Sequence, residues 1–117
     1  MTDIGIYDIT ITQGETWSVT MTFTNDDGSI IDLSGYTIKM QIRKDYNDTI
    51  YQELNSSDNT IDISQAQNGI VIFNLTSTQT GAYDFDVGVY DIKFTASDNT
   101  VKYYVKGVVK INRSITI

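Results

Sequence analysis

The chain has 117 residues, 40% of them hydrophobic, and it contains neither cysteine nor histidine. It therefore lacks disulfides, thiolate metal sites, and the commonest general base and metal ligand of proteins. Eight basic residues stand against fifteen acidic ones, for a net charge of −7, and such a surface repels the phosphates of nucleic acids. We expect a single domain over residues 1–117, with no cofactor, no bound metal and no nucleic-acid partner.

The first third of the chain alternates apolar and polar residues with the period of a β-strand. An opening segment carries four isoleucines whose alternation shifts phase once, as a β-bulge would produce. These are Ile4, Ile6, Ile9 and Ile11. Residues 17–24 then alternate large apolar residues with serine and threonine, which predicts a long strand with Trp17 in the core. The strand ends at a turn over 25–29, where Asp27-Gly28 is typical of a β-hairpin and Gly28 takes a positive φ.

The middle of the chain predicts shorter strands separated by polar turns. A return over 30–33 leads to a tight turn at Ser34-Gly35, and residues 38–43 alternate again. Further strands are expected at 50–51, at 61–63 and at 69–75, the last being a central strand with Phe73 in the core. Residues 76–82 fit one helical turn, with Thr76 or Ser77 as its N-cap.

The last third predicts two strands joined by a turn at 97–99. The first covers residues 89–94, and the second is a long strand over 101–111. Its alternation assigns one set of side chains to the core: Val101, Tyr103, Val105, Gly107, Val109 and Ile111. The intervening set, with Tyr104 and Val108 framed by three lysines, is expected to face outward.

About eight strands, with turn signals roughly every 8–12 residues, are typical of an all-β, immunoglobulin-like antiparallel sandwich of seven to nine strands. A closed barrel is the alternative. The opening residues show no positively charged segment followed by an apolar one, so we expect no secretory signal. No apolar stretch is long enough to span a membrane, so no membrane partner is expected.

Three groups of polar residues are candidates for chemistry. The Asn25–Ser29 segment clusters oxygens that could hold calcium, but a hairpin turn explains it fully. Asp84 and Asp86, with Asp91 nearby, are paired carboxylates without a histidine or a clustered cation to separate their pKa values. The abundant serines and threonines lack a partner base, and no Ser-x-x-Lys motif is present. We therefore expect that the protein is not an enzyme.

Four segments in order resemble a family of small β-sandwich domains from tailed bacteriophages. They are ITQGETWSVTMTF, DDGSIIDLSGYTIKMQIRK, NGIVIFNLTSTQTGAY and GVYDIKFTASDNTVKYYVKGVVKINRSIT, which together span about Ile9 to Ile117. The most specific pieces are Asp32–Arg43 and the final hairpin from Tyr90 to Ile111. The family includes the N-terminal domain of upper-baseplate proteins, which attaches receptor-binding modules to the tail.

This resemblance implies a virion structural protein, a non-catalytic adaptor or decoration of the baseplate, tail or head–tail collar. Its expected partners are other virion proteins and further copies of itself, after synthesis in the host cytoplasm. An apolar centre with a charged rim is typical of a protein interface. On this pattern the predicted interface residues are Tyr104, Val108, Ile115 and Ile117.

The alternative function is a carbohydrate-binding or adhesin module that contacts the host surface. Such a site needs an exposed aromatic side chain beside amides and carboxylates. The Asp45–Asp48 segment, together with Tyr51, supplies these residue types.

Overall fold

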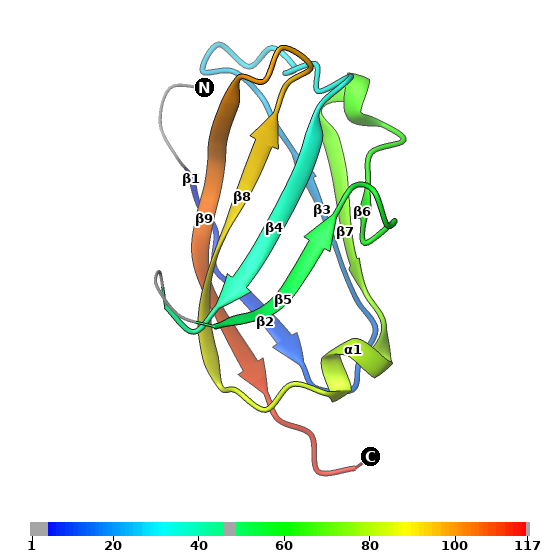
Figure 1. Ribbon diagram of the computed structural model, residues 1–117, viewed down its shortest axis with the longest axis vertical. Helices are drawn as coiled ribbons and strands as arrows, with labels where there is room; N and C mark the ends of the chain where they lie inside the picture. Colours follow the sequence, from blue (N-terminus) through cyan, green and yellow to red (C-terminus); the bar gives the residue numbers. More distant parts are fainter. Residues whose placement is uncertain (1–4, 46–48, 117) are drawn as a thin grey trace.

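The computed structural model describes residues 5–45 and 49–116. Within these residues the chain forms nine strands, one 3-10 turn and one short helix (Figure 1). The strands are β1 (Gly5–Ile6), β2 (Ile9–Thr12), β3 (Trp17–Thr22), β4 (Thr37–Arg43), β5 (Ile50–Asn55), β6 (Ile61–Asp62), β7 (Ile70–Leu75), β8 (Val87–Thr95) and β9 (Val101–Asn112). The 3-10 turn η1 covers Ala66–Asn68, and helix α1 covers Ser77–Gly81.

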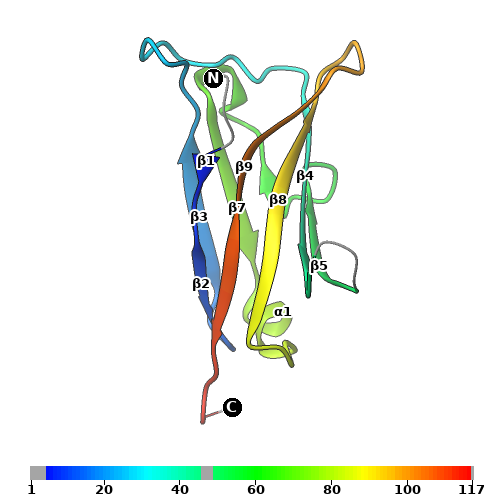
Figure 2. The ribbon, with the colours of Figure 1, turned by 90° about the vertical axis from the view of Figure 1, so that its left-hand side faces the viewer.

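The strands form two sheets that pack face to face (Figure 2). The larger sheet has six strands in the order β1-β9-β8-β4-β5, with β2 also paired to β9. The smaller sheet has the order β3-β7-β6. This arrangement confirms the predicted all-β sandwich. The barrel alternative is wrong, since no strand pairing among the described residues joins the two sheets.

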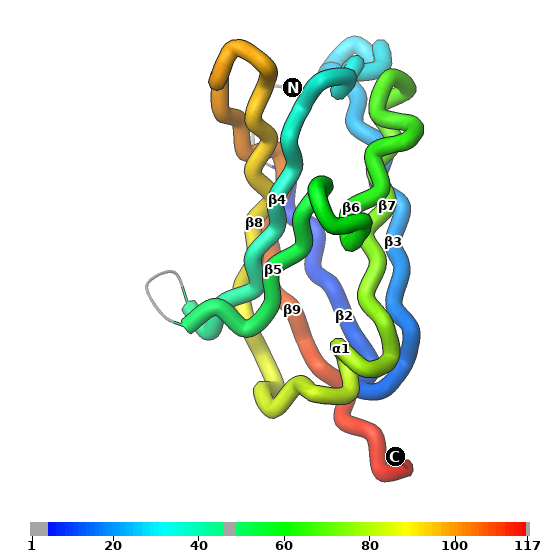
Figure 3. The backbone as a smooth tube through the Cα atoms, turned by 45° about the vertical axis from the view of Figure 1, so that its right-hand side comes forward, coloured from blue at the N-terminus to red at the C-terminus, as the bar shows by residue number. Residues whose placement is uncertain are grey.

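Most neighbouring strands run antiparallel, as predicted, but β1 and β2 pair with β9 in parallel. Figure 3 shows the N-terminal strands beside the final strand. The register is the same for both short strands, with Gly5 opposite Val105 and Ile9 opposite Val109. The expected bulge in this segment is therefore wrong. Ile6 simply points outward and is 75% exposed, whereas Ile9 and Ile11 point into the core. Ile4 lies outside the described residues.

Inward-facing side chains of both sheets form one hydrophobic cluster. Alternation predicted most of its members, because each strand of the larger sheet has one face buried by the smaller sheet. The largest fully buried side chains are Ile11, Leu33, Ile38, Met40, Ile42, Leu54, Ile61, Val71, Phe73, Leu75, Ile92 and Phe94. Phe73 is in the core, as predicted. Trp17 is only half-buried, because β3 lies at the margin of its sheet and is covered from one side.

The predicted phase of β9 is wrong over residues 101–104 and right from Val105 onward. Ile92 on β8 stands opposite Val105, but Lys93 stands opposite Tyr103, so Tyr104 is an extra residue in a β-bulge. Because of this bulge, the Tyr104 side chain faces inward and is 8% exposed, whereas the Tyr103 side chain faces outward and is 42% exposed. Tyr104 packs edge-on against Phe94, with ring centroids 4.9 Å apart.

Gly107 lets the N-terminal strand approach β9. A Cβ at this position would lie 2.2 Å from the carbonyl oxygen of Tyr7. The same carbonyl accepts a hydrogen bond from the Tyr90 hydroxyl group, which projects from the neighbouring strand β8. A side chain at position 107 would therefore displace β1 and break this hydrogen bond.

The predicted turns and helical turn are present. Gly28 and Gly35 both have positive φ, 87° and 78°, which glycine adopts without steric cost. Thr76 caps α1 in a capping box: its side chain accepts from the Gln79 amide, and the Gln79 side chain accepts from the Thr76 amide. The helix is one turn, at the end of the sandwich where β7 leads into β8.

Candidate interaction surface

The four predicted interface residues differ in where the structure places them. Val108 is 43% exposed on the outer face of β9, and Ile115 is fully exposed just after this strand. Tyr104 is buried, so its assignment to the interface is wrong; the bulge described above is the physical reason. Ile117 lies outside the described residues.

Strand register determines which side chains share the outer face of the larger sheet. Directly paired residues point to the same side, and alternate residues to opposite sides. Three rows therefore cross β4, β8 and β9. They are Lys39–Lys93–Tyr103, Gln41–Asp91–Lys106 and Arg43–Val89–Val108. Val87 lies opposite Lys110 and extends the surface along β9, and Glu53 of β5 lies opposite Gln41. We call these residues the outer face.

The outer face concentrates positive charge on an acidic protein. Five of the eight basic residues of the chain lie on it: Lys39, Arg43, Lys93, Lys106 and Lys110. Of the fifteen acidic residues, it holds Glu53 and Asp91. These strand positions therefore have three more positive than negative charges, although the whole chain has a net charge of −7. Asp8 and Asp45 lie at the margins, Asp8 accepting from the Val108 amide.

Side-chain hydrogen bonds order the centre of the outer face. The Gln41 carbonyl oxygen accepts two hydrogen bonds from the Arg43 guanidinium, at 2.7 and 3.2 Å. The Gln41 amide group in turn donates to the Glu53 carboxylate at 2.8 Å. These bonds restrain the long side chain of Arg43, which reduces the entropy that a partner would have to remove on binding.

A shallow hollow of about 260 Å³ lies beside Tyr103. Its lining includes Gln41, Arg43, Asp91 and Val89, and a second hollow of about 250 Å³ adjoins it toward Lys39 and Lys93. Burial raises the pKa of the Asp91 carboxyl above its ordinary value, and the Arg43 guanidinium opposes that shift. The hollow thus combines an exposed aromatic ring with charged and amide groups.

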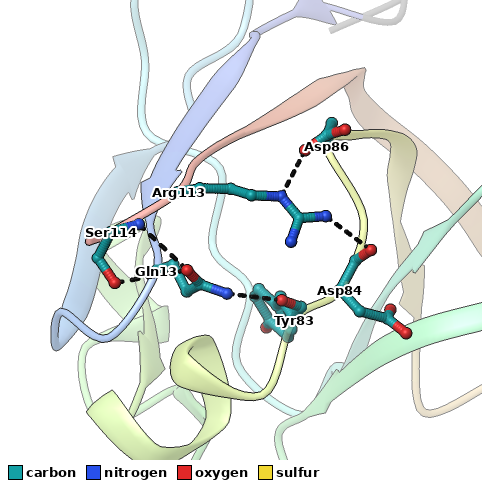
Figure 4. Close-up of polar contacts among 6 residues, drawn as sticks. All are labelled: Gln13, Tyr83, Asp84, Asp86, Arg113 and Ser114. Carbon is teal, nitrogen blue, oxygen red and sulfur yellow. Dashed lines mark hydrogen bonds and ion pairs between the residues drawn. The ribbon is translucent and has the colours of Figure 1, made fainter. Parts of the chain in front are cut away.

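A second polar network holds the segment that follows β9 (Figure 4). Arg113 forms an ion pair with Asp86 at 2.7 Å and donates to the carbonyl oxygen of Asp84 at 2.8 Å. Gln13 donates to the carbonyl oxygen of Tyr83 and accepts from the Ser114 amide. The Asp86 carboxylate and the Asp84 backbone carbonyl are therefore parts of a structural anchor that fixes the path of the chain before Ile115.

The other polar candidates form local turns. Asp27 accepts from the amide and hydroxyl of Ser29, which closes the 25–29 turn. Across the described residues, no group of three or more acidic side chains is placed to hold a metal ion. Tyr51 is not an exposed platform for a sugar, because its ring stacks on Phe85 with centroids 4.0 Å apart. Residues 46–48 of the proposed glycan loop lie outside the described part of the chain.

Sequence reasoning found only part of the outer face. It identified Val108, Lys106 and Lys110 but missed Tyr103, Lys39, Arg43 and Lys93, and it wrongly included Lys102, which pairs with Phe94. The alternation of Lys39, Gln41 and Arg43 was a usable signal, but only the register shows that the strand carrying them, β4, is joined to β9 through β8.

No helix in the described residues has the length and apolarity to cross a membrane. No known protein family and no curated protein matches the chain.

Proposed function

We propose that this protein is a non-catalytic structural module of a tailed-phage virion, and that it assembles with neighbouring virion proteins through its outer face. The observation that carries the proposal is the combination of exposed apolar side chains and clustered basic residues on one face of the larger sheet. Tyr103 lies on one side of the polar row Gln41–Asp91–Lys106, and Val89 and Val108 lie on the other, so apolar contact area and basic groups alternate across this face. Tyrosine and arginine, both present on this face, are enriched at protein interfaces.

The charge distribution favours a partner of opposite sign. Positive groups on the outer face attract an acidic protein surface and orient it before contact, which raises the rate of association. Two copies of the outer face would repel each other, so this surface suits a different surface as its partner. Repeated weak contacts in a particle reinforce one another when several copies bind together.

The polar groups that could do chemistry support a structural role. The chain has no histidine or cysteine, and Asp86 is neutralised by Arg113 in the anchor that holds the end of β9. Together with the resemblance to phage β-sandwich domains, this favours binding over catalysis.

Mass spectrometry of gradient-purified phage particles, with labelled peptide standards, tests the proposal. We expect the chain in the particles at a fixed copy number greater than one. Its absence from particles that are infectious and complete would overturn the proposal.

The hollow beside Tyr103 favours one second candidate, the binding of a carbohydrate. A tyrosine ring flanked by Gln41, Asp91 and Arg43 offers both a stacking surface and hydrogen-bonding groups. A glycan array probed with the wild-type protein and with Tyr103→Ala tests this function. Binding that the variant loses would support it, and the absence of any bound glycan would exclude it.

A further inference from the structure

Strand β3 is an unprotected edge of the smaller sheet. It pairs with β7 on one side, and within residues 5–45 and 49–116 the sheet order places no strand on its other side. Natural sheets usually guard a free edge with charged residues, proline, a bulge or a very short strand, because unpaired backbone groups recruit another strand. Residues Trp17–Thr22 are WSVTMT, with no charge, no proline and no register shift.

The other sheet margins have such protection. Strand β5 carries Glu53 and its pairing with β4 shifts register near Arg43. Strand β6 has two residues. The β1–β2 margin is interrupted between Ile6 and Ile9, where the Asp8 side chain accepts from the Val108 amide. Among the margins that the described residues form, β3 alone is long, regular and uncharged.

The hydrogen-bond pattern identifies which backbone groups are unpaired. The Phe23 amide donates to the Gly69 carbonyl at 2.8 Å, just beyond the paired residues Thr22 and Ile70. Hydrogen-bonded pairs alternate along an antiparallel ladder, so Met21, Val19 and Trp17 also bond to β7. The amides and carbonyls of Ser18, Thr20 and Thr22 therefore point away from β7, toward the free edge.

The side chains beside this edge are also incompletely covered. Trp17, Val19 and Met21 face inward but are only half-buried. An apolar groove of about 310 Å³ separates β3 from the β1–β9 margin; Tyr7, Met21, Phe23 and Val105 line it together with three threonines. Figure 2 shows β3 and the N-terminal strands together at this side of the sandwich. A strand added to β3 would cover these apolar side chains as well as the backbone.

We propose that the occupant is β3 of a second copy, paired antiparallel about a two-fold axis at Thr20. In this register Thr20 lies opposite Thr20 of the partner subunit, and Ser18 lies opposite Thr22. The unpaired amides and carbonyls of Ser18, Thr20 and Thr22 then all form hydrogen bonds with the partner strand. No other symmetric register within β3 pairs all three residues. Because β3 and the groove lining contain no charged residue, two copies meet here without the like-charge repulsion expected at the outer face.

The resulting dimer joins the two smaller sheets into one continuous six-stranded sheet. Two-fold contacts in which one patch meets itself are the commonest form of homo-oligomer. The two outer faces remain free, since they belong to the other sheet. The inference therefore goes beyond the proposed function and does not depend on it: one dimer would present two outer faces to virion neighbours.

Disulfide trapping tests the register, because the chain contains no cysteine of its own. Hydrogen-bonded antiparallel partners have Cα atoms about 5.5 Å apart, within the range that a disulfide spans. Thr20→Cys should therefore cross-link to itself under mild oxidation. Ser18→Cys is the matched control: its symmetry mate lies roughly 14 Å away, so it should form no cross-link alone but should cross-link when mixed with Thr22→Cys. Equal cross-linking of Thr20→Cys and Ser18→Cys would overturn the register.

Charge pairing at Thr20 gives an independent readout that needs no covalent bond. Thr20→Lys and Thr20→Glu each place like charges on the axis, so sedimentation should find each variant monomeric where the wild type is a dimer. An equal mixture of the two should restore the dimer. Circular dichroism confirms that both variants are folded. A wild-type protein that stays monomeric throughout a concentration series, or a mixture that fails to restore the dimer, would overturn the proposal.

Discussion

The two outward surfaces of the sandwich differ in the kind of residue that the strands place there. The larger sheet exposes lysines, an arginine and Tyr103, whereas the smaller sheet exposes serine and threonines of β3 beside the half-buried Ile70 and Ile72 of β7. Both surfaces follow the same period-two alternation. The fold therefore does not dictate which residue types lie on the two surfaces. Their different residue types indicate that the two sheets make different intermolecular contacts.

The outer face and the β3 edge also differ in how each would recognise a partner protein. The outer face offers side chains, which select a partner by charge and shape. The β3 edge offers backbone groups, which accept an extended strand and tolerate many side chains. Changes that affect one region and spare the other are therefore the sharpest way to test the account.

The largest effect is expected from the two adjacent tyrosines of β9, which the bulge directs to opposite sides. Tyr104→Ala removes a buried ring from the Phe23–Phe94 cluster and should lower the free energy of unfolding by about 3–4 kcal/mol. Tyr103→Ala should lower it by less than about 1 kcal/mol, because the ring is exposed. Chemical denaturation measures both. Equal losses would mean that the bulge is misplaced and that Tyr103 does not belong to the outer face.

The next effect concerns the packing of the N-terminal strand on β9. Gly107→Ala places a Cβ against the Tyr7 carbonyl, so β1 must move and Tyr90 loses its hydrogen-bond acceptor. We expect a loss of about 2–3 kcal/mol. Gly81→Ala is the control, since its Cβ would meet Gly14 at an ordinary 3.7 Å. Thermal melts that rank the two variants equally would contradict this packing.

Acid should weaken the turns that connect the strands. Hydrogen bonds from the serine or threonine two residues later hold the pKa values of five aspartates below the ordinary value: Asp27, Asp32, Asp58, Asp62 and Asp98. The folded state binds their protons less readily than the unfolded state, so this stability is present above about pH 4 and is lost as the pH falls further. Asp58→Asn keeps an acceptor oxygen but cannot titrate. Its melting temperature should therefore fall less steeply than that of the wild type between pH 4 and pH 2, and parallel curves would argue against the turn bonds.

The smallest effect has the opposite sign and lies on the outer face. Burial raises the pKa of Asp91, so its ionisation costs stability as the pH rises above the ordinary aspartate value of about 3.9. Asp91→Asn should therefore be slightly more stable than the wild type at pH 7, by no more than about 0.5 kcal/mol since the site is partly solvated. The difference should vanish near pH 3. A destabilised variant at pH 7 would show that Asp91 is held by a favourable ion pair instead.

Local sequence patterns predicted the two-layer fold, the Asp27-Gly28 turn and the capped helical turn, because each depends on residues close in sequence. Alternation predicted the strands, the Asp-Gly pair the turn, and the N-cap residue the helical turn. Alternation could not place the bulge in β9. Tyr103 and Tyr104 are identical, and Val108 and Val109 are as well, so a one-residue shift leaves the pattern almost unchanged. The outer face was only partly predictable for a different reason. Lys39 and Lys93 are far apart in sequence and become neighbours of Tyr103 only through the register of three strands.

The central claim is that the outer face, and not positive charge in general, binds virion neighbours. Two folded double variants of equal charge test it in phage particles: Lys93→Glu with Lys106→Glu changes the outer face, and Lys44→Glu with Lys102→Glu changes exposed lysines outside it. Mass spectrometry of purified particles should find incorporation of the first reduced at least ten-fold, a loss of about 1.4 kcal/mol, and that of the second unchanged. Equal incorporation of the two variants would contradict the claim.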